Sequence, residues 1–229
     1  MQRITLFIFS IVLALTANAS FAGRYELIKG KGVEVCEAYA KNLNSFSPAE
    51  PLLCDRSVNP EFKDLQKLEW ERLDFDQNLD LIVTIDKLLR PDYFAKPEIM
   101  VPSLRGNVEQ DNYKYQRMIV DIDNDGKTEP VLRFVKSCWP GSPVLGGAAL
   151  VVLQQEKKEV DLKKSQLIAK NRLGDYEDGM RDVFLYKGKT YFDNWFVRFA
   201  NAGQLHVMRT ENGETKEICK MRFLPKQIY

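Results

Sequence analysis

The strongest constraint on the fold is an alternation of apolar and polar side chains that begins near residue 113. Its clearest example is the segment 204–223, QLHVMRTENGETKEICKMRF, in which Asn212-Gly213 separates two alternating runs. Asn-Gly is the preferred two-residue loop of a type I′ hairpin, because both of its residues must adopt a positive φ. In the register that this loop sets, His206 would lie opposite Cys219. We therefore expect the C-terminal half to form antiparallel β-structure.

Other strand-like runs precede this hairpin. Residues 114–122 and 129–136 alternate and flank an Asp-rich stretch. Residues 147–154 form a continuous apolar run, which is typical of a central strand buried on both faces. Residues 182–199 indicate two strands joined at a tight turn around Gly188. Together these runs predict an antiparallel sheet of about seven strands.

The preceding part of the chain has helical periodicity. In 33–46, four residues recur at i, i+3, i+4 and i+7, the spacing of one helical face: Cys36, Tyr39, Ala40 and Leu43. A weaker helix is expected at Glu61–Trp70, and another at 78–89, where Arg90-Pro91 ends it. We expect an α+β fold in which a mainly helical part, 23–112, precedes a β part, 113–229. Whether the two parts form one domain stays open.

The first 22 residues have the three parts of a secretory signal peptide. Arg3 supplies the positive start, Ile4–Leu15 is mainly apolar, and small residues allow cleavage after Ala22, or after Ala19. The apolar run is shorter than the roughly 18 to 20 residues that a spanning helix needs. We expect a periplasmic or secreted protein with no membrane anchor after cleavage.

The charge balance argues against nucleic-acid binding. Removing the signal peptide removes Arg3 and leaves 32 basic and 32 acidic residues. Nucleic-acid binders usually carry a basic excess, because neutralising phosphates supplies much of their affinity. The lysine-rich segment 154–166 also contains Glu156, Glu159 and Asp161. We interpret it as a solvated loop or strand end.

Four cysteines suit an exported protein in which disulfides persist. They are Cys36, Cys54, Cys138 and Cys219, and four cysteines allow three pairings. Loop-closure entropy favours the pair that is near in sequence, Cys36 with Cys54, which leaves Cys138 with Cys219. We therefore expect two disulfides. A cysteine metal site is disfavoured, because the chain has no C-x-x-C pair and one histidine.

The most informative chemical motif is 119–134, IVDIDNDGKTEPVLRF. Calcium takes oxygen ligands, and a short loop can surround it when alternate side chains point inward. The expected ligands are the side chains of Asp121, Asp123, Asp125 and Glu129 and the backbone carbonyl of Lys127, with Gly126 allowing the sharp turn. The alternative is a solvated turn without an ion, since Asn-Asp-Gly is common in turns.

This motif resembles the D-x-D-x-D-G-x-x-[DE] calcium loops of EF-hands, dockerins, and FG-GAP or VCBS-type modules. The EF-hand form would need a Glu where Leu132 stands, and the flanks of this loop are strand-like. The resemblance is therefore to the strand-loop-strand form of FG-GAP and VCBS modules, although one copy is present and no full propeller is expected. It implies a structural calcium ion, bound in the range of about 10⁻⁴ to 10⁻³ M that extracellular modules show.

Motifs for catalysis are sparse. The sequence has no G-x-S-x-G elbow, P-loop or H-E-x-x-H motif, and no nucleophile or carboxylate stands near His206 in sequence. Paired carboxylates in EWERLDFDQNLDL could hydrolyse glycosides, namely Glu69, Glu71, Asp74 and Asp76. The same acids fit an ordinary solvated face.

These observations lead us to expect a non-catalytic, exported, calcium-binding protein that binds another exported protein. One alternative is an inhibitor or immunity-type protein that blocks a lytic enzyme in the same compartment. Another is a carbohydrate-acting hydrolase. A stoichiometric protein partner would favour the inhibitor, and loss of sugar cleavage in Glu69→Gln would favour the hydrolase.

Overall fold

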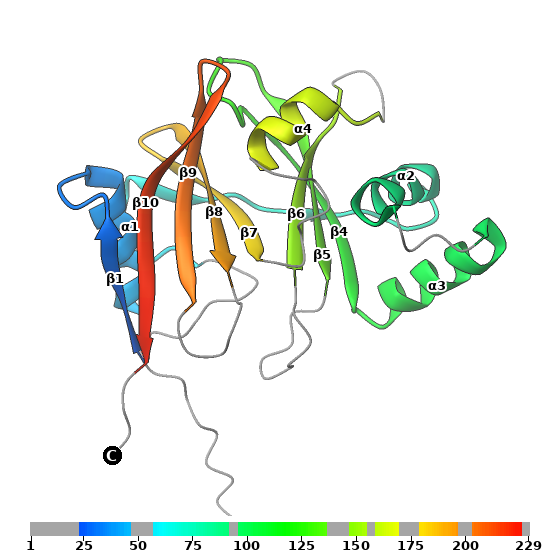
Figure 1. Cartoon of the computed structure of the whole chain (residues 1–229), viewed down its shortest axis with the longest axis horizontal. Coiled ribbons are helices and arrows are strands. Elements are labelled where there is room, and N and C mark those ends of the chain that lie inside the picture. Colours follow the sequence, from blue (N-terminus) through cyan, green and yellow to red (C-terminus); the bar gives the residue numbers. More distant parts are fainter. Residues whose placement is uncertain are drawn as a thin grey trace, which may run out of the picture.

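The fold is mostly β. The computed structural model describes residues 23–46, 57–91, 96–136, 147–154, 159–169, 179–196 and 203–225. Within these ranges, ten strands form two antiparallel sheets and four helices pack on them (Figure 1). The strands are β1 Gly23–Lys29, β2 Leu65–Lys67, β3 Glu71–Arg72, β4 Tyr113–Val120, β5 Glu129–Lys136, β6 Gly147–Val152, β7 Met180–Tyr186, β8 Lys189–Phe196, β9 Gln204–Glu211 and β10 Glu214–Pro225. The helices are α1 Glu34–Ser45, α2 Leu79–Leu89, α3 Pro97–Glu109 and α4 Leu162–Ala169.

The prediction of N-terminal helices followed by one C-terminal sheet is wrong. The six-stranded sheet has the order β1-β10-β9-β8-β7-β2, and the four-stranded sheet has the order β3-β4-β5-β6. β1 opens the described chain and pairs with β10, while β2 and β3 also come from the part expected to be helical. The two sheets approach each other where the Ala148 amide donates to the Gly179 carbonyl at 2.9 Å. Pairing between distant strands is a tertiary property that local periodicity does not contain.

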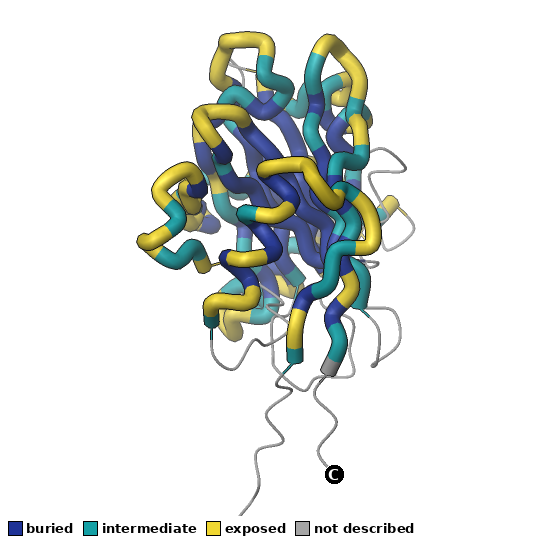
Figure 2. The backbone as a smooth tube through the Cα atoms, turned by 90° about the vertical axis from the view of Figure 1, so that its left-hand side faces the viewer, coloured by how far each residue is buried: buried dark blue, intermediate teal, exposed yellow. Residues whose placement is uncertain are grey.

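Three clusters of buried side chains make up the core. One lies between α1 and the six-stranded sheet, and a second lies between α2, α3 and the four-stranded sheet. The third joins the two sheets beneath α4, with Val131 and Leu150 from one sheet, Val183 and Phe192 from the other, and Ile168 from the helix. Figure 2 shows the buried strands inside and the exposed turns and helix faces outside. The third cluster holds both sheets together next to the acidic loop.

Two of the three helix predictions are confirmed. α1 buries Cys36, Tyr39, Ala40 and Leu43, the residues expected on its inner face. α2 ends at Leu89, directly before Arg90-Pro91. The helix expected at Glu61–Trp70 is wrong, since this stretch contributes the short strand β2. None of the helices in the described ranges is long and apolar enough to cross a membrane.

The β9–β10 hairpin follows the predicted turn but not the whole predicted register. Asn212 and Gly213 have φ values of 55° and 72°, as a type I′ loop requires. Pairing is regular as far as Met208 with Glu217, and a bulge at Ile218 then places Cys219 opposite Val207. His206 consequently pairs with Lys220 and not with Cys219. The extra residue moves the odd-numbered side chains of β10 to the opposite face after the bulge.

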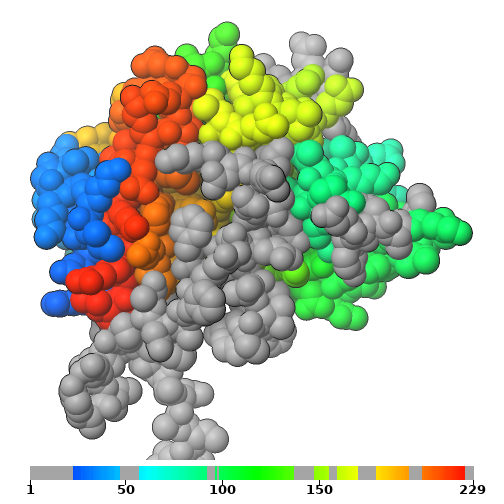
Figure 3. Space-filling view, in the orientation of Figure 1, coloured from blue at the N-terminus to red at the C-terminus, as the bar shows by residue number. Residues whose placement is uncertain are grey.

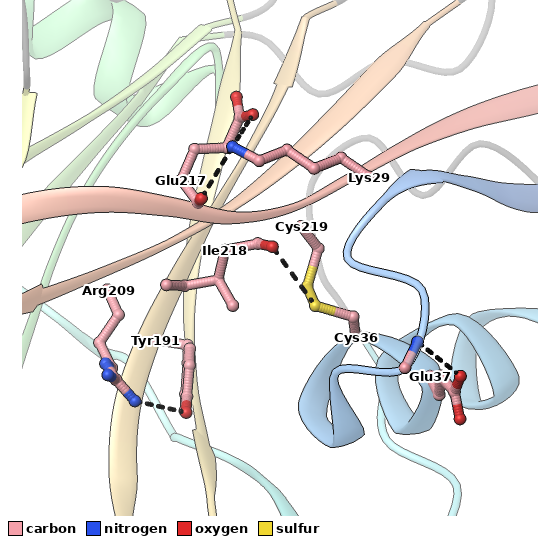
Figure 4. Close-up of a disulfide and its surroundings, with 9 residues drawn as sticks. Lys29, Cys36, Glu37, Tyr191, Arg209, Glu217, Ile218 and Cys219 are labelled. Carbon is pink, nitrogen blue, oxygen red and sulfur yellow. Dashed lines mark hydrogen bonds and ion pairs between the residues drawn. A yellow bond between two sulfur atoms is a disulfide. The ribbon is translucent and has the colours of Figure 1, made fainter.

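The bulge places Cys219 against α1, where it forms a disulfide with Cys36 (Figure 4). The predicted pairs Cys36–Cys54 and Cys138–Cys219 are therefore wrong. The prediction relied on short loop closure, whereas the pairing of β1 with β10 brings the two ends of the described chain together. Cys54 and Cys138 lie outside the described residues, as does the expected signal peptide. The disulfide indicates an oxidising, exported environment.

Candidate metal-binding site

The acidic loop connects β4 to β5. Val120 and Glu129 face each other as the last pair of the β4–β5 ladder, and residues 121–128 form the connection between them. The Asp121 carboxylate curls this connection by accepting hydrogen bonds from the amides of Asp125, at 3.0 Å, and Gly126, at 2.9 Å. Gly126 adopts a φ of +91°, a conformation that glycine tolerates best. The loop is thus closed by its own first carboxylate.

Three of the predicted ligands come together. Asp121, Asp123 and Glu129 each offer an oxygen within 4.8 Å of the others, so this triad could hold a metal ion. Glu129 is buried because it shares a strand face with Val131, two residues along β5. Asp123 Oδ1 is also buried and has no hydrogen-bond partner within the described part of the chain. Buried polar atoms are normally satisfied, so the position of this oxygen suits a cation.

The other two predicted ligands lie outside this triad. Asp125 is more exposed, and its Oδ1 accepts a hydrogen bond of 2.8 Å from the Lys127 amide. Lys127 is exposed. The roles expected for the Asp125 carboxylate and the Lys127 carbonyl stay predictions.

A lysine from α4 enters the acidic loop. Lys164 Nζ lies 2.5 Å from Glu129 Oε1, 2.8 Å from Asp123 Oδ2 and 3.8 Å from Asp125 Oδ2. Partial burial would lower the pKa of Lys164, but hydrogen bonds to Asp123 and Glu129 outweigh it and raise that pKa. The lysine is therefore a permanently charged neighbour of the triad at neutral pH.

Ionisation of the Glu129 carboxyl is still unfavourable, although Lys164 lies beside it. Burial raises the pKa of Glu129, and the negative charge of Asp123 raises it further, although the hydrogen bond from Lys164 lowers it. Two like charges 4 Å apart repel by about 4 kcal/mol at an effective dielectric constant of 20. The loop carries four carboxylates, those of Asp121, Asp123, Asp125 and Glu129. One ammonium group is too few to balance their negative charge.

Asn124 attaches the loop to the other sheet. Its side-chain amide donates to the carbonyls of Thr190, at 3.1 Å, and Thr210, at 2.9 Å, and its Oδ1 accepts from the Thr190 amide at 2.8 Å. Asn124 has a φ of 57°, which Asn adopts more easily than most residues. Asn124 therefore links the β4–β5 loop to strands β8 and β9 of the six-stranded sheet.

Sequence reasoning missed both Lys164 and the role of Asn124. The interpretation of 154–166 as a solvated loop or strand end is wrong for its last part, because α4 begins at Leu162. The available signal was Asp161, whose Oδ1 accepts from the Lys164 amide at 2.9 Å, the usual N-cap bond. No local signal indicated that the lysine side chain would meet the Asp-rich loop.

The carboxylates considered for glycoside hydrolysis lie at a different place. Asp74 and Asp76 line an open pocket of about 500 Å³ together with Arg105. Arg105 makes two hydrogen bonds to Asp76, and these bonds lower the pKa of that carboxyl. Glu71 is exposed on β3 and lies 3.5 Å from Arg117. The lowered pKa makes Asp76 less suited to donating a proton at neutral pH.

His206 has a carboxylate partner that the sequence did not indicate. Its Nδ1 lies 2.6 Å from Glu217 Oε2, and Lys29 Nζ lies 3.0 Å from Glu217 Oε1. The Lys29–Glu217 contact is drawn in Figure 4, beside the disulfide. The bulge in β10 places this group and Cys219 on opposite faces of the sheet.

Comparisons of the chain with known protein families, curated proteins and solved structures found no match.

Proposed function

We propose that the 121–129 loop binds calcium and that the protein is a non-catalytic exported binding module stabilised by this ion. The observation that carries the proposal is the triad of Asp121, Asp123 and Glu129, with the buried Asp123 Oδ1 lacking a donor within the described ranges. Carboxylate oxygens are the ligands that calcium prefers, and it accepts irregular geometry more readily than magnesium does.

The position of the loop supports a structural role for the ion. The triad combines two side chains of the β4–β5 loop with the first residue of β5. Asn124, within the same loop, bonds the backbone of β8 and β9. A cation that stiffened the loop would therefore also stiffen the junction between the two sheets. Such a site would stabilise the surfaces that a partner contacts, without taking part in chemistry.

The proposed partner is another exported protein. The disulfide supports an extracytoplasmic setting, in which millimolar calcium is common and a weak site of about 10⁻⁴ to 10⁻³ M would fill. An exported lytic enzyme is one partner of this class. To test for it, enzymes that bind to the calcium-loaded protein are isolated and their activity is assayed with and without the protein. Loss of activity identifies an inhibitor, and unchanged activity identifies a binder that does not inhibit.

Calcium binding is tested by calorimetric titration and thermal unfolding of the full chain. At a calcium concentration of about 100 times Kd, binding to the folded state adds about 2.7 kcal/mol to the free energy of unfolding. For a chain of this size we expect Tm to rise by roughly 5 to 10 °C.

The variant Asp123→Asn keeps the shape of the side chain and removes its charge, so we expect it to lose this rise. The control Glu61→Gln removes one exposed negative charge away from the loop and should keep the rise. Equal melting temperatures of the native chain in chelator and in roughly 100 mM calcium, which is about 100 times the weakest expected Kd, would refute the proposal.

A further inference from the structure

The ammonium group of Lys164 lies among the oxygens that a metal ion would use. It contacts Asp123 and Glu129, two members of the triad, and approaches Asp125. The lysine side chain is 27 % exposed, so it reaches the loop from the solvent side and is not sealed into the core. A tethered cation thus lies in the acidic loop.

The backbone that carries this lysine is firmly attached. Ser165 Oγ exchanges hydrogen bonds with the amide and the carbonyl of Val152, at 2.9 and 3.3 Å. The Leu167 carbonyl accepts from Thr215 Oγ1 at 2.7 Å, which joins α4 to the final hairpin. Figure 3 shows the yellow-green surface of α4 against the orange-red tip of that hairpin. The helix therefore keeps its place when the Lys164 side chain moves.

An ammonium group and a metal ion would compete for the oxygens of Asp123 and Glu129. Asp123 Oδ2 and Glu129 Oε1 are both used by Lys164, which leaves Asp123 Oδ1 and the second Glu129 oxygen. Glu129 Oε2 already accepts a weak hydrogen bond from the Ile122 amide at 3.3 Å. A divalent ion within the triad would also repel the ammonium group at close range. Entry of the ion therefore favours movement of the lysine side chain toward solvent.

We propose that Lys164 is a built-in competitor that sets the calcium affinity of the loop. This inference rests on the proposed function. Without calcium, the ammonium group neutralises part of the acidic cluster and keeps the loop assembled. With calcium, Lys164 turns outward while Ser165 and Ile168 keep α4 in place. Calcium binding then costs the energy of breaking two ion pairs, so the site is weaker than its carboxylates alone would make it.

The test compares calcium affinities of full-length variants. Lys164→Met removes the ammonium group and keeps an unbranched side chain of similar length. Lys163→Met is the matched control, because Lys163 is the preceding, exposed residue of α4 and its replacement changes the net charge equally. Calorimetric titration with calcium chloride should give at least tenfold tighter binding for Lys164→Met than for the native chain, and an unchanged affinity for Lys163→Met.

The outcomes separate this inference from the proposed function. If the native chain binds calcium and Lys164→Met binds it no tighter, competition is refuted while the calcium site stands. If only Lys164→Met binds, Lys164 blocks the loop of the native chain, which refutes both the proposed function and a role of Lys164 in setting the native affinity. If neither binds, both are refuted.

A variant that unfolds without calcium is also informative. If Lys164→Met and Lys164→Gln are unfolded in chelator, calcium should restore their circular dichroism signal and raise their Tm more than it raises that of the native chain. Failure of calcium to restore either variant would overturn the inference.

Discussion

Cys36 and Cys219 form a disulfide between residues that are 183 positions apart in the chain. Cys36 lies on the inner face of α1, and Cys219 follows the bulge in β10. Both are fully buried. The bond therefore encloses most of the described chain in one covalent loop, including the whole four-stranded sheet and all of the six-stranded sheet except β1 and the end of β10.

Removing this bond should destabilise the protein markedly. We expect Cys36→Ala/Cys219→Ala to lose about 2 to 5 kcal/mol of unfolding free energy, because a long loop becomes free in the unfolded state. Urea unfolding followed by circular dichroism measures the loss. The oxidised native chain is the reference, and an equal midpoint with an equal m-value would contradict the prediction.

Asn124 should contribute to stability through both its amide and its backbone. Asn124→Ala removes three hydrogen bonds to Thr190 and Thr210 and places alanine at a φ of 57°. We expect a loss of about 2 to 4 kcal/mol. Asn124→Gly removes the same bonds without the backbone strain, so it should be less damaging in thermal unfolding. Equal losses in the two variants would show that the backbone conformation costs nothing.

The Glu217 carboxyl should make stability depend on pH. Partial burial opposes its ionisation, but hydrogen bonds from Lys29 and His206 outweigh burial and lower its pKa below the ordinary value of 4.5. The folded protein therefore binds this proton less readily than the unfolded chain does. The contribution is fully present above pH 4.5 and is lost as pH falls through the lower, folded-state pKa.

Urea unfolding between pH 3 and 6 tests this prediction. Glu217→Gln should show a shallower loss of stability with falling pH than the native chain does. The matched control Glu214→Gln, on an exposed residue of the same strand, should keep the native slope. The prediction fails if both variants change the slope equally.

Removing one member of the Asp86–Arg90 ion pair should lower the free energy of unfolding strongly, whereas replacing both members should lower it less. Asp86, in the last turn of α2, forms an ion pair with Arg90, the residue that follows the helix, and the two side chains are 1 % and 9 % exposed. Burial raises the pKa of Asp86, although Arg90 works against the increase. Removing one partner leaves a buried charge without its counter-ion, which typically costs 3 to 5 kcal/mol, about the effect expected for Asp86→Asn.

A double-mutant cycle measures this relationship. Asp86→Asn/Arg90→Met should lose less unfolding free energy than the sum of the two single variants, because no isolated charge remains. Chemical denaturation at pH 7 provides all four values. Strict additivity would mean that the pair does not interact.

Local spacing predicted several elements correctly. The helical face around Cys36 and Tyr39 depends on residues within two turns of each other, and the turn at Asn212-Gly213 depends on two adjacent residues. Spacing failed at Glu61–Trp70, where the chain forms a short edge strand against β7. α3 was missed because Pro97 and Pro102 obscure its pattern, although Pro97 stands at the first helical position, where proline is tolerated.

For the candidate site, the local sequence was enough to indicate an acidic loop with a sharp turn, because alternating carboxylates and Gly126 act over a few residues. The cysteine pair, the bulge at Ile218 and the approach of Lys164 depended on the assembled fold. Each arises from contacts between segments that are distant in sequence, and the packing of α4 and the two sheets selects such contacts. Residue spacing along the chain therefore could not show that the ammonium group of Lys164 contacts the carboxylates of the acidic loop.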